Sequence, residues 1–115
     1  MLLDLNNFKI VNDSEGHLKG DEILKLAGDA LREAATSNDY TARWGGDEFI
    51  IILSNTNNNT KKKTINELRT KLKGIIDFEI GETHSQKNDT LDELVKRADE
   101  AMYKQKHNRR RTDST

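Results

Sequence analysis

The chain has 115 residues, of which 33% are apolar and 34% charged, so it can form one compact domain but is too short for two. Its 19 basic and 20 acidic residues leave a net charge of −1, which excludes a general attraction to nucleic acid or to an anionic membrane. The absence of cysteine excludes disulfides, thiolate metal sites and thiol nucleophiles, and agrees with a reducing cytoplasm.

The N-terminal segment predicts a short apolar strand, Leu2 to Leu5, followed by turn-forming residues 6–17 that can hold only a brief helix. Two leucines before an acid are too few for a signal peptide, and no run of about 18 apolar residues follows. We therefore expect a cytoplasmic protein with no membrane span.

An amphipathic helix is expected from Lys19 to about Ala35. Its apolar residues recur at helical spacing and would pack on a sheet: Leu24, Ala27, Leu31 and Ala34. Tyr40–Trp44 and Phe49–Leu53 then predict a β-hairpin. Because the second arm is apolar at every position, we expect a central strand that is covered on both faces.

The second half of the chain starts with a polar loop over residues 54–63 and a helix that contains Ile65, Leu68 and Leu72 and ends at Gly74. The alternation from Ile76 to Ile80 predicts a strand with Asp77 and Glu79 on a solvated face.

The last expected helix is capped by Asp89 or Thr90. Its inward-facing residues are Leu91, Leu94, Val95, Ala98, Ala101 and Met102. Residues 1–107 would form the domain and residues 108–115 a basic tail that frays. The order of elements predicts an α/β fold of the α+β sandwich type, with a mainly antiparallel central sheet flanked by helices.

The hairpin is interrupted by Gly45, Gly46, Asp47 and Glu48. The glycines suit a tight turn with positive φ and let a ligand approach the backbone, while two acids facing water are the ordinary interpretation. Asp4, however, breaks the first strand where its carboxylate can meet the other two acids. Three carboxylates repel unless cations neutralise them, and Mg²⁺ commonly binds such groups together with substrate phosphates. This pattern favours two-metal phosphoryl or nucleotidyl transfer.

Three stretches resemble, in order and spacing, the motifs of the GGDEF family of diguanylate cyclases: DLNNFKIVNDSEGHLKGDEIL, RWGGDEF and ADEAMYKQK. The resemblance covers the chain from Leu2 to Arg110. It implies a palm-like fold shared with nucleotidyl cyclases and polymerases. It also implies that two GTP condense into cyclic di-GMP with release of two pyrophosphates, between two domains that pair antiparallel and each present one GTP. The implied cofactor is Mg²⁺ or Mn²⁺.

The resemblance also implies roles for the acids. Asp4 matches the first metal ligand, with the carbonyl of Leu5 assisting. Asp47 matches the residue that activates the 3′-hydroxyl and shares the metal, and Glu48 matches the second carboxylate ligand. Asp47 and Glu48 are therefore the expected catalytic residues.

The substrate contacts are implied in the same way. Asn12 and Asp21 match the pair that binds guanine, although on their own they would suit a turn and the first turn of a helix. Lys106 and Arg110 match the pair that holds the terminal phosphates, although they could be only the cationic end of a helix. Gly45 and Gly46 match the glycines that leave room for the α-phosphate. Phe8 and Lys9 match the start of the short helix that wraps the triphosphate, where backbone N–H groups can donate.

The chain departs from the family pattern at several positions. Asn6 stands where many members have aspartate, which predicts a modestly lower metal affinity. Thr36 stands where an arginine would complete a product-inhibition motif with Asp39, so product feedback there is not expected. Glu79, Ile80 and Gly81 stand for the usual Ser-Ile-Gly.

The helix and the dimerising domain that normally precede the first strand are absent from this sequence. We therefore expect catalysis to need a transient or partner-assisted homodimer. The alternatives are a weakly active or inactive module that binds GTP or a partner, and a small palm-type synthase of another cyclic dinucleotide.

Overall fold

The computed structural model describes residues 1–54 and 57–113, with side chains given through residue 105. Its elements, in chain order, are β1 (Leu2–Leu5), α1 (Phe8–Glu15), α2 (His17–Ala34), β2 (Tyr40–Arg43), β3 (Glu48–Ile52), α3 (Asn58–Leu72), β4 (Phe78–Gly81) and α4 (Leu91–Asp113). This is the predicted order, and the α+β class is confirmed.

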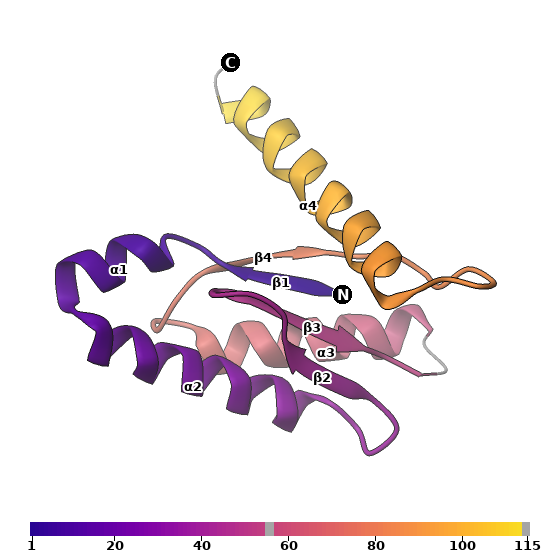
Figure 1. The fold of residues 1–115 in the computed structure, drawn as a ribbon, viewed down its shortest axis with the longest axis horizontal. Helices are drawn as coiled ribbons and strands as arrows, with labels where there is room; N and C mark the ends of the chain where they lie inside the picture. The colour runs from indigo at the N-terminus through magenta and orange to yellow at the C-terminus, as the bar shows by residue number, and fades with distance from the viewer. Residues whose placement is uncertain (55–56, 114–115) are drawn as a thin grey trace.

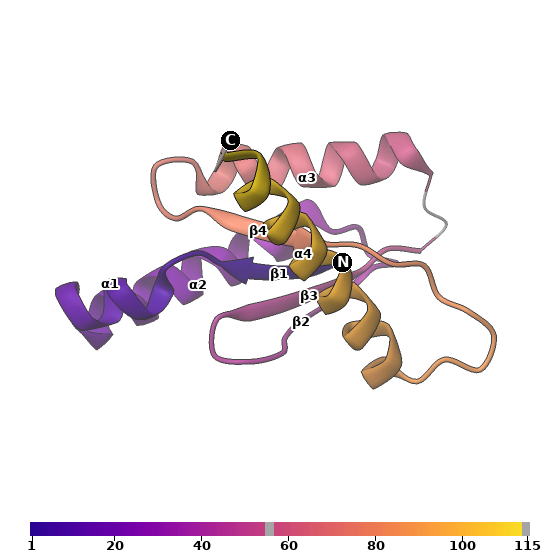
Figure 2. The ribbon, with the colours of Figure 1, turned by 90° about the horizontal axis from the view of Figure 1, so that it is seen from above.

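The four strands form one antiparallel sheet in the order β2-β3-β1-β4. Helices α2 and α3 lie against one face, and α4 crosses the opposite face obliquely (Figure 1). Seen from above, α4 passes over β1 and β3, while α1 projects beyond the end of β1 (Figure 2). The predicted central position of β3 is confirmed, although Ile52 at its end is 40% exposed.

The alternation of side chains along β1 sorts the core into two clusters. Leu3 and Leu5 point toward α2 and α3 and join the larger cluster, which includes Phe49, Leu31 and Leu68. Leu2 points to the other face and packs with Ile50, Ala98 and Met102 under α4. Asp4 shares that second face, which places a carboxylate beside the smaller cluster.

The buried stripe of α2 is wider than the predicted one. Ala27 and Leu31 are buried as expected, whereas Leu24 and Ala34 are only partly buried. Ile23 and Ala30 complete the buried face instead. The buried face is therefore shifted by a fraction of a turn relative to the expected stripe, so that Ile23 enters the core and Leu24 lies at its edge.

Helix α3 begins inside the segment that we expected to be a loop. The side chain of Asn57 caps it, because its Oδ1 accepts a hydrogen bond from the N–H of Thr60 at 2.9 Å. The helix ends as predicted, since Gly74 follows Leu72 and Lys73 with a left-handed φ of 79°.

The prediction of a solvated face on β4 is wrong. Asp77 is exposed, but Glu79 is only 9% exposed, because helix α4 packs over the same face. Helix α4 starts at Leu91 and its cap is Thr90, whose Oγ1 accepts from the N–H of Glu93 at 3.2 Å. The domain boundary at residue 107 stays a prediction.

Asp89 braces the loop before α4. Both of its oxygens accept hydrogen bonds from Arg97, at 2.9 and 2.6 Å, and Arg97 also donates to the carbonyl of His84 at 3.0 Å. The Arg97 guanidinium, followed by the N–H of Gln86, lowers the pKa of Asp89 from 3.8 to about 2.

We expect Asp89→Asn to lower the thermal unfolding midpoint at neutral pH. A carboxyl whose folded pKa is depressed stabilises the fold above its unfolded pKa, and this contribution disappears as the pH falls through the folded pKa. The difference between wild type and variant should therefore be constant near neutrality and shrink between about pH 4 and about pH 2. Circular dichroism melts across this range measure it. A difference that stays the same at low pH would contradict the brace.

Candidate functional site

The acids predicted from the sequence meet across β1 and β3. Asp4 and Glu48 are directly paired in the antiparallel register, so both side chains leave the same face of the sheet. The N–H of Leu5 donates to the carbonyl of Asp47 at 3.1 Å. Because hydrogen-bonded and non-hydrogen-bonded pairs alternate, Asp4 and Glu48 form a non-hydrogen-bonded pair, with Cα atoms about 4.5 Å apart.

The same ladder fixes the neighbouring backbone. In a strand, the N–H and the carbonyl of one residue point to the same side, so the Leu5 carbonyl faces the hairpin loop that holds Asp47. Asp4, Asp47 and Glu48 are all half-buried. The structure thus gathers two paired carboxylates, a third one in the adjacent loop and a carbonyl at one end of the sheet.

The glycines of the loop leave room because they have no side chain, and neither has a positive φ. The prediction of positive φ is therefore wrong. The positive-φ glycines of the described chain are Gly16 and Gly74. A Cβ on Gly45 would lie 3.2 Å from Oε1 of Glu48, so glycine lets that carboxylate lie against the loop. A Cβ on Gly46 would meet no described atom within 4 Å. Gly46 therefore leaves open space beside the acids.

Arg43 shapes this loop and was not singled out from the sequence. Its Nε donates to the carbonyl of Gly45 at 3.1 Å and its Nη2 to the carbonyl of Gly46 at 2.8 Å. The N–H of Trp44 donates to the carbonyl of Glu48 at 2.8 Å and closes the hairpin. Both loop carbonyls turned toward Arg43 are thereby held on the side of β2.

Helices α1 and α2 place a polar pair near the end of β1. Asn12 packs against Gly20 so closely that a Cβ on Gly20 would lie 1.7 Å from Asn12 Oδ1. This Oδ1 is buried and has no hydrogen-bond partner within the described residues. Asp21, the next residue after Gly20, is exposed. The structure therefore brings Asn12 close to Asp21, with one acceptor still unsatisfied by the described chain.

We expect Gly20→Ala to displace the Asn12 amide, since the new methyl group occupies the place of Oδ1. Binding of a fluorescent GTP analogue should weaken about tenfold or more, because an orientation-dependent hydrogen bond is lost.

Gly28→Ala in the same helix is the matched control. Its Cβ would lie 3.5 Å from the nearest described atom, which is ordinary contact. It should stabilise the protein by about 0.5–1 kcal/mol through helix propensity and leave binding unchanged. Equal binding by both variants would contradict the role of the contact between Asn12 and Gly20.

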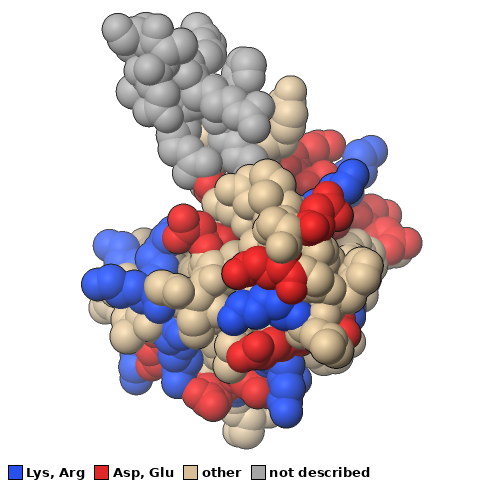
Figure 3. Space-filling model, turned by 90° about the vertical axis from the view of Figure 1, so that its left-hand side faces the viewer, with Lys and Arg blue, Asp and Glu red and all other residues tan. Residues whose placement is uncertain are grey.

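The remaining candidates are placed unevenly. Phe8 begins α1 and is buried against the core, whereas Lys9 is exposed beside it. Lys106 and Arg110 lie outside the residues whose side chains the structure describes. Acidic and basic side chains are interspersed over the side of the molecule shown in Figure 3, which agrees with the balanced charge.

The donor set suits Mg²⁺ only together with a substrate. Within residues 1–54 and 57–105, no group of three histidine or acidic side chains is arranged to hold a metal ion by itself. Asp4 and Glu48 offer hard oxygen ligands from paired strands, and Leu5 a carbonyl. Mg²⁺ commonly binds through one or two carboxylates plus phosphate oxygens and waters, so the residues present fit the ion when a phosphate completes the shell.

Glu79 is the acid that the sequence reasoning missed at this site. It pairs directly with Asp4 on the other side of β1, so Glu48, Asp4 and Glu79 form one row across three strands. The alternation of apolar and acidic residues in this segment predicted a solvated face, so Glu79 was not expected at the site. Its only sequence signal was an acid in an otherwise apolar strand.

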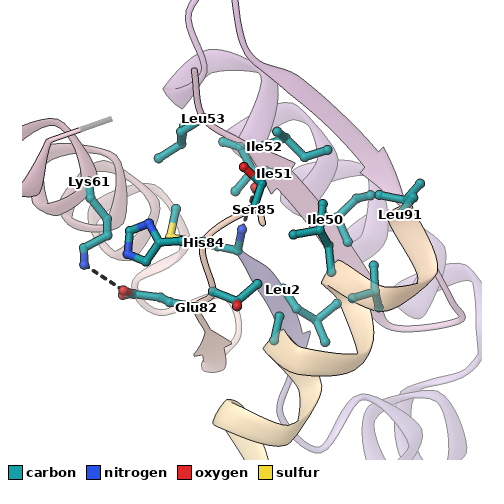
Figure 4. A pocket seen from close by; sticks show the side chains of 15 residues that line it. Leu2, Ile50, Ile51, Ile52, Leu53, Lys61, Glu82, His84, Ser85 and Leu91 are labelled. Atoms are coloured by element: carbon teal, nitrogen blue, oxygen red, sulfur yellow. Dashed lines mark hydrogen bonds and ion pairs between the residues drawn. The ribbon is translucent and has the colours of Figure 1, made fainter. Parts of the chain in front are cut away.

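A separate cavity of about 340 Å³ opens at the other end of β1 and β3 (Figure 4). It is lined by Leu2, Ile50 and the start of α4, and an ion pair between Lys61 and Glu82, 2.8 Å, lies at its edge. The Met1 ammonium donates there to the carbonyl of Ile51 at 2.6 Å, and burial lowers its pKa. None of the candidate residues whose side chains the structure describes lines this cavity.

No helix among the described residues combines the length and the apolar character needed to cross a membrane.

Known proteins match nearly the whole chain. A family model described as "Diguanylate cyclase, GGDEF domain" matches residues 1–112. Diguanylate cyclase DgcM of Escherichia coli is 36% identical over 117 residues, which cover 96% of this chain and 28% of DgcM. The signaling protein YkoW of Bacillus subtilis is 40% identical over 113 residues, which cover 88% of this chain and 14% of YkoW. The chain thus spans less than a third of each of these relatives.

A solved structure agrees with these matches. Diguanylate cyclase SiaD from Pseudomonas aeruginosa, crystallised in complex with its activator SiaC, superposes with a TM-score of 0.83 at 27% identity. The match covers 93% of this chain and 45% of SiaD.

Proposed function

This chain belongs to the GGDEF family of diguanylate cyclase domains, and from that membership and the geometry of its acids we propose that it condenses two GTP into cyclic di-GMP. The observation that carries the proposal is the direct pairing of Asp4 with Glu48, next to the loop that holds Asp47. Two like charges opposite each other on paired strands are unfavourable for folding alone. Such an arrangement is typical of a site that holds cations.

In the proposed mechanism, Asp4, Glu48 and the Leu5 carbonyl hold Mg²⁺ or Mn²⁺. The bound cation supplies charge neutralisation at the triphosphate. Gly46 leaves room for the α-phosphate, and the first N–H groups of α1 donate to the phosphates farther along.

Asn12 and Asp21 bind guanine. The unsatisfied Asn12 Oδ1 accepts a hydrogen bond from the base, and the Asp21 carboxylate accepts from guanine N–H groups. Lys106 and Arg110 complete the proposed contacts to the terminal phosphates.

Asp47 accepts the proton of the ribose 3′-hydroxyl as that oxygen attacks the α-phosphorus of the GTP held by a second domain. A new 3′–5′ phosphodiester bond forms, the bond to the β-phosphate breaks, and pyrophosphate leaves. The 3′-hydroxyl of the second nucleotide then attacks the α-phosphorus of the first, a second pyrophosphate leaves, and the ring closes. One domain holds one GTP, so a homodimer is needed, either transient or supported by a partner.

We do not propose product feedback at Asp39, because its carboxylate has a structural role. One oxygen of Asp39 accepts from the N–H of Thr36 at 2.8 Å and the other from the N–H of Ser54 at 3.0 Å. The carboxylate therefore ties the loop before β2 to the end of β3, and Thr36 offers no cation to a phosphate.

The test is incubation of the purified protein with GTP and Mg²⁺, at increasing protein concentration and as a fusion to a dimerising coiled coil. We expect cyclic di-GMP, formed at a rate that rises faster than linearly with protein concentration and is higher in the fusion. Competition by the other three nucleoside triphosphates tests base choice. Tight binding of GTP without product in either form, unaffected by Asp47→Ala, would contradict the enzyme and favour a binding module.

A further inference from the structure

Glu79 is a buried carboxylate in the middle of β4, the last strand in chain order. It is 9% exposed and lies opposite Asp4 in the register of β1 and β4. The N–H of Asn6 donates to the carbonyl of Asp77 at 2.8 Å, so the pair two residues back, Asp4 and Glu79, is also a hydrogen-bonded pair. Its Cα atoms are therefore about 5.5 Å apart.

Asn6 contacts one of these two acids, Glu79. It lies two residues after Asp4 on the same side of the chain, and its Nδ2 donates to Oε1 of Glu79 at 3.5 Å. A buried carboxylate that receives an amide hydrogen bond stays in one orientation. Glu79 thus lies within reach of the Asn6 amide and places a second acidic side chain beside Asp4.

We propose that Glu79 is a positioning residue of the cation site, which holds Asn6 in place and raises the affinity of the site for a divalent cation by its charge. This proposal rests on the function proposed above and adds a residue to that same site. Apart from Glu48, it is the acid directly paired with Asp4 in the sheet register. Attraction between a divalent cation and a carboxylate one strand away is only weakly screened, because helix α4 limits access of water to Glu79.

The test is titration of the full chain with Mn²⁺, with free Mn²⁺ followed by electron paramagnetic resonance, alone and with a GTP analogue that resists cleavage between the α- and β-phosphates. Glu79→Gln keeps the shape and the acceptor for Asn6 but removes the charge. We expect its Mn²⁺ affinity to fall about tenfold. Glu82→Gln, which removes the same charge from the residue that pairs with Lys61, should bind Mn²⁺ like wild type.

Rescue separates charge from structure. In Glu79→Gln, the further change Asn6→Asp returns a carboxylate to the neighbouring position on the same face and should restore Mn²⁺ affinity to within about threefold of wild type. If Glu79→Gln does not fold, Asn6→Asp alone provides the test, since an added charge should then tighten Mn²⁺ binding severalfold.

The outcomes separate this inference from the proposed function. Wild-type Mn²⁺ affinity in Glu79→Gln, or a loss that Asn6→Asp does not restore, would overturn the role of Glu79 while binding by the wild type upholds the site. Unchanged affinity in Asn6→Asp alone would also overturn it. Failure of the wild type to bind Mn²⁺ with or without the nucleotide would overturn both.

Discussion

Glu48→Gln is expected to abolish synthesis of cyclic di-GMP and leave the fold intact. The substitution keeps the size of the side chain, and so its place against Gly45, but replaces a charged oxygen ligand by a neutral amide. Charge stabilisation by a metal ion supplies several kcal/mol at a reacting phosphate, so we expect turnover to fall by about 10³-fold or more.

The stability of this variant provides an independent signature. Asp4 and Glu48 are like charges in a directly opposed pair. Removing one of them should therefore leave the free energy of unfolding unchanged or raise it by about 0.2–1 kcal/mol. Glu67→Gln is the matched control, since Glu67 lies on α3, which covers the other face of the sheet, and it should retain activity. Turnover within threefold of wild type in Glu48→Gln would remove Glu48 from the site.

The order of elements was predictable because each signal was local. A helical repeat of apolar residues predicted α2 and the end of α3, and Gly74 predicted where α3 stops. The start of α3 was missed because a segment rich in asparagine and lysine hides an effective cap, Asn57. Capping by one side chain outweighs the polar composition of the residues that follow it.

The pairing of the acids depended on information that is not local. A strand alternates with period two, but only its register tells which residues of the neighbouring strands share a face. The meeting of Asp4 with Glu48 was expected from the pattern of charges, and the structure pairs them. The position of Glu79 required knowing that α4 covers β4, which the alternation within residues 76–80 does not reveal.

Glycine is the residue whose role the sequence described least well. Gly45 and Gly46 looked like positions of unusual backbone geometry, and the structure shows positions where a side chain is missing instead. Gly20 is restricted by Asn12 of the neighbouring helix α1, and Gly81 by Ala98 and Met102 of α4. These contacts arise from packing between elements, so no local pattern indicated them. A glycine inside a regular element is a sign of close approach whose partner only the fold identifies.

Gly81 is the position where a single methyl group should damage the fold most. A Cβ there would lie 1.9 Å from the carbonyl oxygen of Ala98 and 2.8 Å from Cβ of Met102. Both atoms belong to the rigid part of α4, one to its backbone and one to the base of a side chain, so no rotamer change relieves the overlap. Helix α4 must move away from β4.

We therefore expect Gly81→Ala to lower the free energy of unfolding by about 3 kcal/mol, measured by denaturant titration. The displaced helix loses contact with Leu2 and Ile50, which together with Ala98 and Met102 form the smaller cluster. Gly46→Ala is the matched control, because its Cβ meets no described atom within 4 Å, and its free energy of unfolding should stay within about 0.5 kcal/mol of wild type. A variant as stable as wild type would show that α4 does not rest on β4 at this distance.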